Sequence, residues 1–132
     1  NMIRVSFLII SIISLIYGLM FLLFPYWFVN FTEAEITNIA WLRNLGASII
    51  GLLFFGSLSI YIRPGGKIAI LKVMALTSIM QTSALIYSRF YNEFSAKNII
   101  IVDLTIYLAI FISIYFAWLI FFKWRYFDKK FI

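Results

Sequence analysis

Residues 99–122 read IIIVDLTIYLAIFISIYFAWLIFF, an apolar run in which Asp103 is the single charged residue. A helix needs about 20 consecutive, mostly apolar residues to cross a bilayer. Similar runs cover approximately residues 3–24, 36–62 and 68–90, so four such segments use most of the 132-residue chain. The sequence therefore predicts an all-α membrane protein, a bundle of four transmembrane helices that forms one domain over residues 1–132.

The composition supports a membrane protein and excludes several kinds of chemistry. The chain is 64% hydrophobic and 12% charged, whereas soluble domains carry about 25% charged residues. It contains no cysteine and no histidine, which removes disulfides, thiolate chemistry and the commonest metal ligand and general base. No glycine-rich phosphate loop or nucleophile constellation is present. We therefore expect no enzyme activity, no cofactor and no metal site.

The boundaries of the spans carry their own signals. The first run is too long for the apolar region of a signal peptide, and no small-residue cleavage site follows it, so it predicts a retained helix that stops at Pro25. The motif Thr32-Glu33-Ala34-Glu35 predicts a capping box at the start of the second span, with Thr32 as N-cap. Arg63-Pro64-Gly65-Gly66 predicts a sharp end to that span.

Lysine and arginine are distributed unequally between the two sides of the membrane. Eight lie on the side of the chain's ends: Arg4, Arg63, Lys67, Lys72, Lys123, Arg125, Lys129 and Lys130. Three lie on the other side: Arg43, Arg89 and Lys97. Since basic residues accumulate in the cytoplasm, the predicted topology is N-in and C-in. The richness in Ile, Phe, Tyr, Asn and Lys fits a bacterial source, so a multi-pass protein of the inner membrane is expected, with both termini cytoplasmic.

Three charges fall at a similar depth near the outer boundary and are the leading candidate site. Arg43 lies about two turns into the second span, Arg89 in the last turn of the third, and Asp103 about one turn into the fourth. Buried charges normally pair inside a bundle, so we expect Asp103 to pair with Arg43 or Arg89. The excess guanidinium could create an outward-facing pocket for a carboxylate, phosphate or lipid head group. The structural alternative, which is favoured, is that Asp103 bridges both arginines and merely locks three helices together, or that Arg89 extends to the membrane interface.

Polar and small residues predict where helices contact one another. Gln81 falls near mid-membrane in the third span, either as a polar lining or, more commonly, as an interhelical hydrogen-bonding group. Small residues predict close packing along three stripes: Ser11, Ser14 and Gly18; Ala40, Asn44, Ala47 and Gly51; and Thr105, Ala109, Ser113 and Ala117. The pattern leaves open whether the packing partner is another helix of this chain or another protein.

The C-terminal tail alternates basic and aromatic residues. Lys123, Trp124, Arg125, Lys129 and Lys130 follow directly from the fourth span, and this arrangement predicts contact with anionic lipids of the inner leaflet. We therefore attribute the net charge of +6 to basic residues that contact lipid head groups. No nucleic acid is expected as a partner.

Several of these residues together resemble a known group. Tyr17-Gly18, Phe24-Pro25, Arg43-Asn44-Leu45-Gly46 and Gly51, followed by Arg89 and an acidic residue at position 103, resemble small four-helix bacterial membrane proteins of the DoxX-like superfamily and its uncharacterised relatives. In that group a Glu is commoner than Asp at the acidic position. The resemblance implies the fold and the charged trio, and it implies no settled activity.

The leading functional hypothesis is a non-catalytic bundle that acts as a small accessory or assembly subunit of a larger inner-membrane complex. The partners would be membrane lipids and other membrane protein subunits, or further copies of the chain. The second hypothesis is binding or transport of a small amphiphile, lipid or anion through a pocket at Arg43, Arg89 and Asp103, with Gln81 deeper in the path. An enzyme that uses Asp103 as acid or base is the least favoured, since no second convergent carboxylate or histidine accompanies it.

Overall fold

The computed structural model describes residues 2–32, 39–91 and 99–128. Within these ranges four helices are long and apolar enough to cross a membrane: Met2–Leu23, Ile39–Ile62, Ile68–Phe90 and Ile99–Phe122. Their bounds agree with the predicted spans within a few residues, because the apolar runs end at Pro25, at Arg63-Pro64 and at charged or polar residues. The chain is therefore an all-α protein with four candidate membrane helices. The first is α1 (Met2–Leu23), the third α5 (Ile68–Phe90) and the fourth α6 (Ile99–Phe122).

The second span is not the uninterrupted α-helix that the sequence predicted. It consists of α3 (Ile39–Ser48), a π-helical segment η1 (Ile49–Phe54) and α4 (Phe55–Ile62). A π-helical turn shifts the register of the side chains and often occurs at functional sites. The helix ends at Ile62 as expected, and Gly66 in the following turn has a φ of 74°, a conformation that favours glycine.

Two short helices follow spans in places where the sequence indicated only connecting segments. They are α2 (Pro25–Thr32), which begins with proline at its first position, and α7 (Trp124–Asp128). Thr32 is the last residue of α2, and its hydroxyl donates to the carbonyls of Phe28 and Val29. The other members of the predicted capping box, Glu33 and Glu35, lie outside the described residues, so the box stays a prediction.

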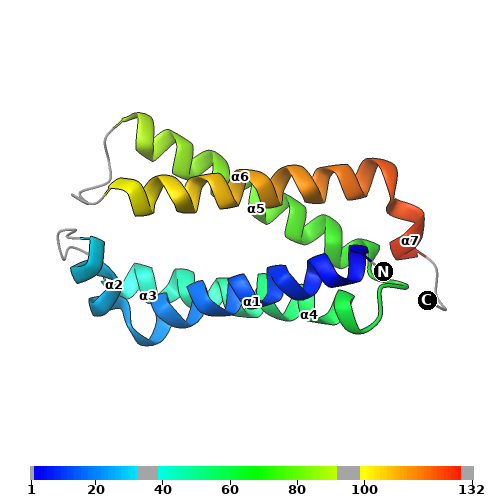
Figure 1. Ribbon diagram of the computed structural model, residues 1–132, viewed down its shortest axis with the longest axis horizontal. Helices are drawn as coiled ribbons and strands as arrows, with labels where there is room; N and C mark the ends of the chain where they lie inside the picture. Colours follow the sequence, from blue (N-terminus) through cyan, green and yellow to red (C-terminus); the bar gives the residue numbers. More distant parts are fainter. Residues whose placement is uncertain (1, 33–38, 92–98, 129–132) are drawn as a thin grey trace.

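The helices form two antiparallel pairs. α1 packs along α3, η1 and α4, and α5 packs along α6 (Figure 1). Met2, the turn between α4 and α5, and α7 lie at one end of the bundle, here called the terminal end. The C-terminal ends of α2 and α5 and the first turns of α3 and α6 lie at the other end, here called the opposite end. Between the two pairs, α4 and α5 come close to each other at the terminal end, next to the turn that joins them.

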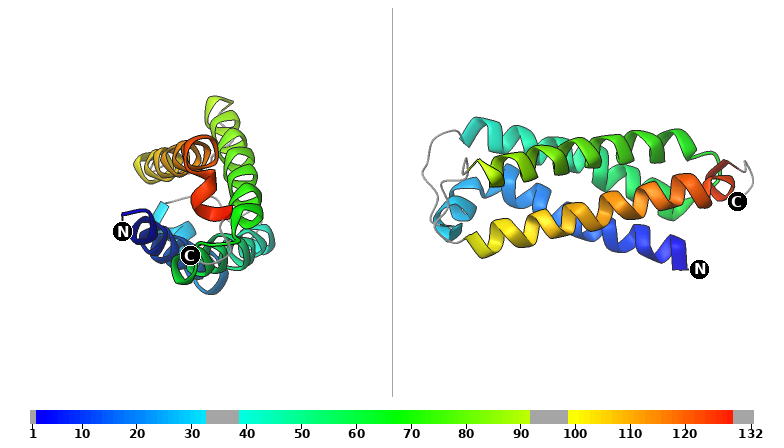
Figure 2. Two further views of the ribbon diagram at one scale, coloured as in Figure 1. Left: turned by 90° about the vertical axis from the view of Figure 1, so that its right-hand side faces the viewer. Right: turned by 90° about the horizontal axis from the view of Figure 1, so that it is seen from above.

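The tightest packing lies at the terminal end. Phe7, Phe116 and Phe127 are fully buried there. The ring of Phe7 stacks on Phe116 at 5.9 Å between centroids and meets Phe127 edge-on at 5.7 Å. α7 folds inward over this end (Figure 2), and the Lys67 amide donates to the Phe127 carbonyl at 2.8 Å. Aromatic burial therefore joins the two helix pairs at one end of the molecule.

Many large apolar side chains lie on the outer surface of the bundle. Large side chains such as Phe111, Phe121 and Ile100 are each at least 75% exposed. Soluble monomers seldom expose apolar patches larger than a few hundred Å², so this surface fits hydrocarbon as the solvent. The four long apolar helices and their exposed faces together indicate a multi-pass membrane protein.

The close helix contact of α1 with α3 runs through Gly18 and Gly46. A Cβ added to Gly46 would lie 2.6 Å from the Leu22 amide nitrogen and 2.8 Å from the Gly18 carbonyl oxygen. The predicted stripe on the first span is buried, as expected for a contact surface. The predicted stripe on the second span is not a contact within this chain, since Ala40, Asn44, Ala47 and Gly51 are exposed. The helix turns Gly46 toward α1 and carries that stripe to the outside.

Candidate functional site

A cavity of about 530 Å³ lies between the two helix pairs. Every long helix contributes to its wall, and so do α2 and η1. Among the described residues, the wall is mostly aliphatic and aromatic and includes no Asp, Glu, Lys or Arg. Its apolar members are Ile13, Phe21, Phe28, Leu42, Leu45, Ile49, Leu53, Ala84, Leu85, Val102, Leu108, Ala109 and Ile112. The described part of the wall between the two helix pairs is thus mostly apolar and carries no formal charge.

Two hydrogen bonds between helices border this cavity. The hydroxyls of Tyr17 in α1 and Thr105 in α6 lie 3.2 Å apart and connect the two helix pairs. Thr82 in α5 and Ser113 in α6 lie 2.9 Å apart and connect the helices of one pair. Thr105 was expected on the small-residue stripe of the fourth span. The role of Tyr17 was missed, because spacing within one helix does not reveal which residue faces it across the bundle.

Gln81 and Ser78 line the same cavity from α5. Ser78 is 4% exposed, and its Oγ has no hydrogen-bond partner within the described part of the chain. Gln81 is half-buried. Both fall near the middle of the Ile68–Phe90 helix, which is the depth expected for Gln81. The cavity therefore combines an apolar wall with a few neutral polar groups.

The charged trio does not form one cluster. Arg89 Nε donates to Asp103 Oδ1 at 2.9 Å, which is one of the two pairings expected for Asp103. Arg43 instead donates to the carbonyl of Leu22 at 2.9 Å, near the end of α1. None of the three lines the 530 Å³ cavity. The geometry thus places the charges beside the cavity, with Arg43 on one helix pair and the Arg89–Asp103 ion pair on the other.

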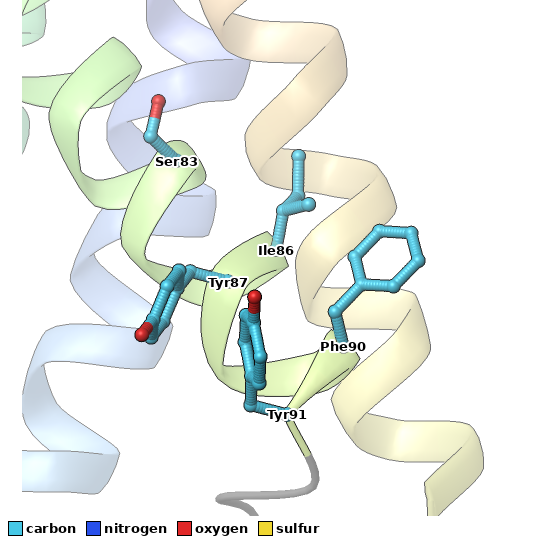
Figure 3. Close-up of a pocket in the computed structure, with 5 residues that line it drawn as sticks. All are labelled: Ser83, Ile86, Tyr87, Phe90 and Tyr91. Carbon is cyan, nitrogen blue, oxygen red and sulfur yellow. The ribbon is translucent and has the colours of Figure 1, made fainter.

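A second hollow lies on the outside of α5. It has a volume of about 620 Å³ and is lined by Ser83, Ile86, Tyr87, Phe90 and Tyr91 (Figure 3). The rings of Tyr87 and Tyr91 lie 4.6 Å apart between centroids. Four of these residues come from the last turns of α5 and Tyr91 directly follows the helix, so the hollow is a shallow aromatic surface. Its position fits the aromatic belt that membrane proteins place at the bilayer interface.

The C-terminal basic and aromatic residues divide into two groups. Lys123, Trp124 and Arg125 are exposed at the terminal end. The charged groups of Lys123 and Arg125 lie 6.0 Å and 5.4 Å from the ring centroids of Trp118 and Trp124. Lys129 and Lys130 lie outside the described residues, so their contact with lipid stays a prediction.

Comparison with known proteins adds one positive finding. Residues 1–118 match the model of a family described as a domain of unknown function, DUF8292. No curated protein and no solved structure matches the chain. The match carries no assignment to the DoxX-like superfamily, and that resemblance stays a prediction. Since the matched region covers most of the chain, from the first helix into α6, the chain belongs to the DUF8292 family.

Proposed function

We propose that this protein binds the hydrocarbon part of a neutral amphiphile or lipid in the cavity between its two helix pairs. The observation that carries the proposal is the cavity itself, which has a volume of about 530 Å³ and whose described wall residues are uncharged and mostly apolar. Pockets that hold small organic ligands measure about 300–1,000 Å³ and are lined mainly by apolar side chains with a few polar groups. From the sequence alone, an accessory subunit was the leading hypothesis and binding of an amphiphile or lipid was the second.

The distribution of charge favours a neutral ligand over an anion. Arg89 is engaged by Asp103, and Arg43 donates to a backbone carbonyl. A carboxylate or phosphate in the cavity would meet no cation among the described residues of the wall, and burying an uncompensated charge is costly. The proposed role is binding without catalysis, because Tyr17 is the one ionisable side chain among the described wall residues.

Filling the cavity tests the proposal. Ala109 belongs to the cavity wall, and Ala69 is exposed on α5 outside it. We expect Ala109→Phe to lower the amount of co-purified amphiphile about tenfold, equivalent to about 1.4 kcal/mol, because the ring would occupy the ligand's volume. Native mass spectrometry of protein released from nanodiscs measures the bound mass directly.

The matched control is Ala69→Phe, which adds the same ring to a lipid-facing position and should retain the wild-type amount of bound amphiphile. Equal occupancy in wild type and Ala109→Phe, or an absence of bound amphiphile in wild type, would contradict the proposal.

A second candidate function is that of a subunit in a larger membrane complex. The observation in its favour is the exposed stripe of Ala40, Asn44, Ala47 and Gly51. A Cβ added to Gly51 would meet no atom within 4 Å in the described structure. Small residues allow close approach between helices, and an amide in hydrocarbon gains from a partner. Crosslinking in native membranes, read as the mass of the crosslinked species, measures whether the chain is part of an assembly.

We further propose that both termini lie in the cytoplasm and that the membrane is a bacterial inner membrane. The support is the concentration of basic residues at the terminal end, where Arg4, Arg63, Lys67, Lys123 and Arg125 lie, in agreement with the positive-inside rule. The chain has no native cysteine, so single cysteines introduced at either end report the topology. Labelling of a terminal-end cysteine by an impermeant maleimide in intact cells would contradict this orientation.

A further inference from the structure

The wall of the cavity carries polar groups near the middle of the spans and nearer the opposite end. Ser14 lies near the middle of α1 (Met2–Leu23), and Ser78 and Gln81 lie near the middle of α5 (Ile68–Phe90). Nearer the opposite end, the wall includes Tyr17, Thr32, Ser88 and Thr105 together with apolar side chains. Tyr17 and Thr105 are hydrogen-bonded to each other, and Thr32 is hydrogen-bonded to a carbonyl of its own helix. Ser14, Ser78 and Gln81 differ from these residues in their hydrogen bonding.

These three residues also differ from other polar residues of the same helices. The hydroxyls of Ser11, Thr77 and Ser83 each donate to a carbonyl one turn earlier, at 2.7–2.9 Å, which is the usual solution for a hydroxyl on a helix. Ser78 Oγ makes no such bond. Within the described part of the chain, the Ser14 hydroxyl and the Gln81 amide also have no hydrogen-bond partner.

Polar groups without partners are costly in this setting. In the bilayer core, water is not at hand to satisfy them, and each unsatisfied group costs free energy. A group supplied by a bound molecule would remove that cost. The carboxamide of Gln81 offers both donors and an acceptor, and each serine hydroxyl can donate and accept. The complementary group therefore both donates and accepts hydrogen bonds. It is uncharged, since no charged residue is found among the described residues of the wall.

We propose that Ser14, Ser78 and Gln81 form a deep recognition site for the hydroxyl or carboxamide group of a single-chain amphiphile. This inference rests on the proposed function and adds the class and orientation of the ligand. The polar group lies at mid-membrane against Gln81, and the hydrocarbon chain extends along the apolar wall toward the opposite end. The ligand thus binds with its polar group inward, opposite to the orientation of a bilayer lipid in the adjacent leaflet.

Competition between matched probes in nanodiscs tests the inference. An alkane that carries a photoactivatable diazirine labels the cavity, and dodecane, dodecanol and dodecanamide compete for it. We expect Gln81→Leu to raise the dodecanol and dodecanamide concentrations needed for half displacement about three- to tenfold, the effect of losing one net hydrogen bond. Dodecane should compete equally in both proteins. Each competitor partitions into the lipid to the same extent with either protein. The ratio of its half-displacement concentrations in the two proteins is therefore independent of this partitioning.

Two further variants complete the design. Ser78→Ala removes a buried hydroxyl without adding volume and should also raise the dodecanol concentration needed for half displacement. This variant replaces Gln81→Leu if the Gln81→Leu protein does not fold. Ser83→Ala is the matched control, because Ser83 is exposed on α5 and bonded within its own helix; its displacement values should equal those of wild type.

The outcomes separate the two proposals. If the alkane probe does not label the cavity, or no competitor displaces it, the proposed function itself fails. If dodecane displaces the probe while neither variant changes the alcohol and amide values, the deep site is not a recognition site and enclosed water satisfies its polar groups. Selective weakening of the alcohol and amide in Gln81→Leu and Ser78→Ala supports the inference.

Discussion

Gly46 allows α3 to approach α1 more closely than a residue with a side chain would. The space its Cβ would enter is bounded by backbone atoms of Gly18 and Leu22, which cannot rotate away. Gly51, five residues later in the same span, faces open space. Two glycines of one span therefore have different structural roles. Substituting each by alanine should have different effects on stability.

We expect Gly46→Ala to lower the stability of the folded protein by about 1–3 kcal/mol, the usual cost of inserting a group into a packed interior. Gly51→Ala should leave the melting temperature unchanged or raise it, since alanine has the higher helix propensity. Thermal unfolding of the purified proteins, followed by circular dichroism, measures both. A Gly46→Ala protein as stable as wild type would contradict the close contact between α1 and α3.

The three charges show that residue spacing predicts the depth of a side chain in the membrane but not its partner. Counting residues from the ends of the spans gave the depth of Arg43, Arg89 and Asp103, and the bilayer forces charges at one depth to find partners. Depth does not give the direction in which a side chain leaves its helix. Arg43 is directed toward the end of α1 and donates to Leu22, whereas Arg89 meets Asp103. The ion pair was therefore predictable as one of two alternatives, and the separation of Arg43 was not.

At the scale of elements, the long helices were predictable and the short ones were not. Span length is set by the thickness of the hydrocarbon, so apolar runs bounded by proline and charged residues define α1, α5 and α6 closely. α2 and α7 are too short to show a hydrophobic period, and η1 depends on tertiary packing of an apolar run that is also compatible with an ordinary α-helix. The cavity was missed for the same reason, since its wall includes η1 residues such as Ile49 and Leu53.

The exposed stripe on α3 leads to a prediction at this scale. If another membrane protein or a second copy packs there, Asn44→Leu should weaken the assembly, because it removes an amide that would hydrogen-bond across the interface. Interhelical hydrogen bonds in membranes contribute about 0.6 kcal/mol on average, so the expected change in dissociation constant is about threefold.

Sedimentation equilibrium or single-molecule photobleaching in nanodiscs measures this change. Val73→Leu on the exposed face of α5 serves as the control for adding apolar surface elsewhere. If the wild-type protein is monomeric and native crosslinking captures no partner, the second candidate function is wrong.

At the scale of the whole molecule, packing is asymmetric along the bundle. The aromatic rings of Phe7, Phe116 and Phe127 hold the two helix pairs together at the terminal end. Toward the middle and the opposite end, the pairs are separated by the cavity, with the Tyr17–Thr105 hydrogen bond between them. A bundle that is closed at one end and hollow further along can hold a guest without unpacking its core, which is the physical basis of the proposed binding role.

The most direct test of this account is a high-resolution density map of the wild-type protein in lipid nanodiscs. The account predicts elongated density between the α1–α3 and α5–α6 pairs, with one end within hydrogen-bonding distance of the Gln81 amide. A cavity that contains only discrete water peaks, or helix pairs that close together and leave no cavity, would contradict it.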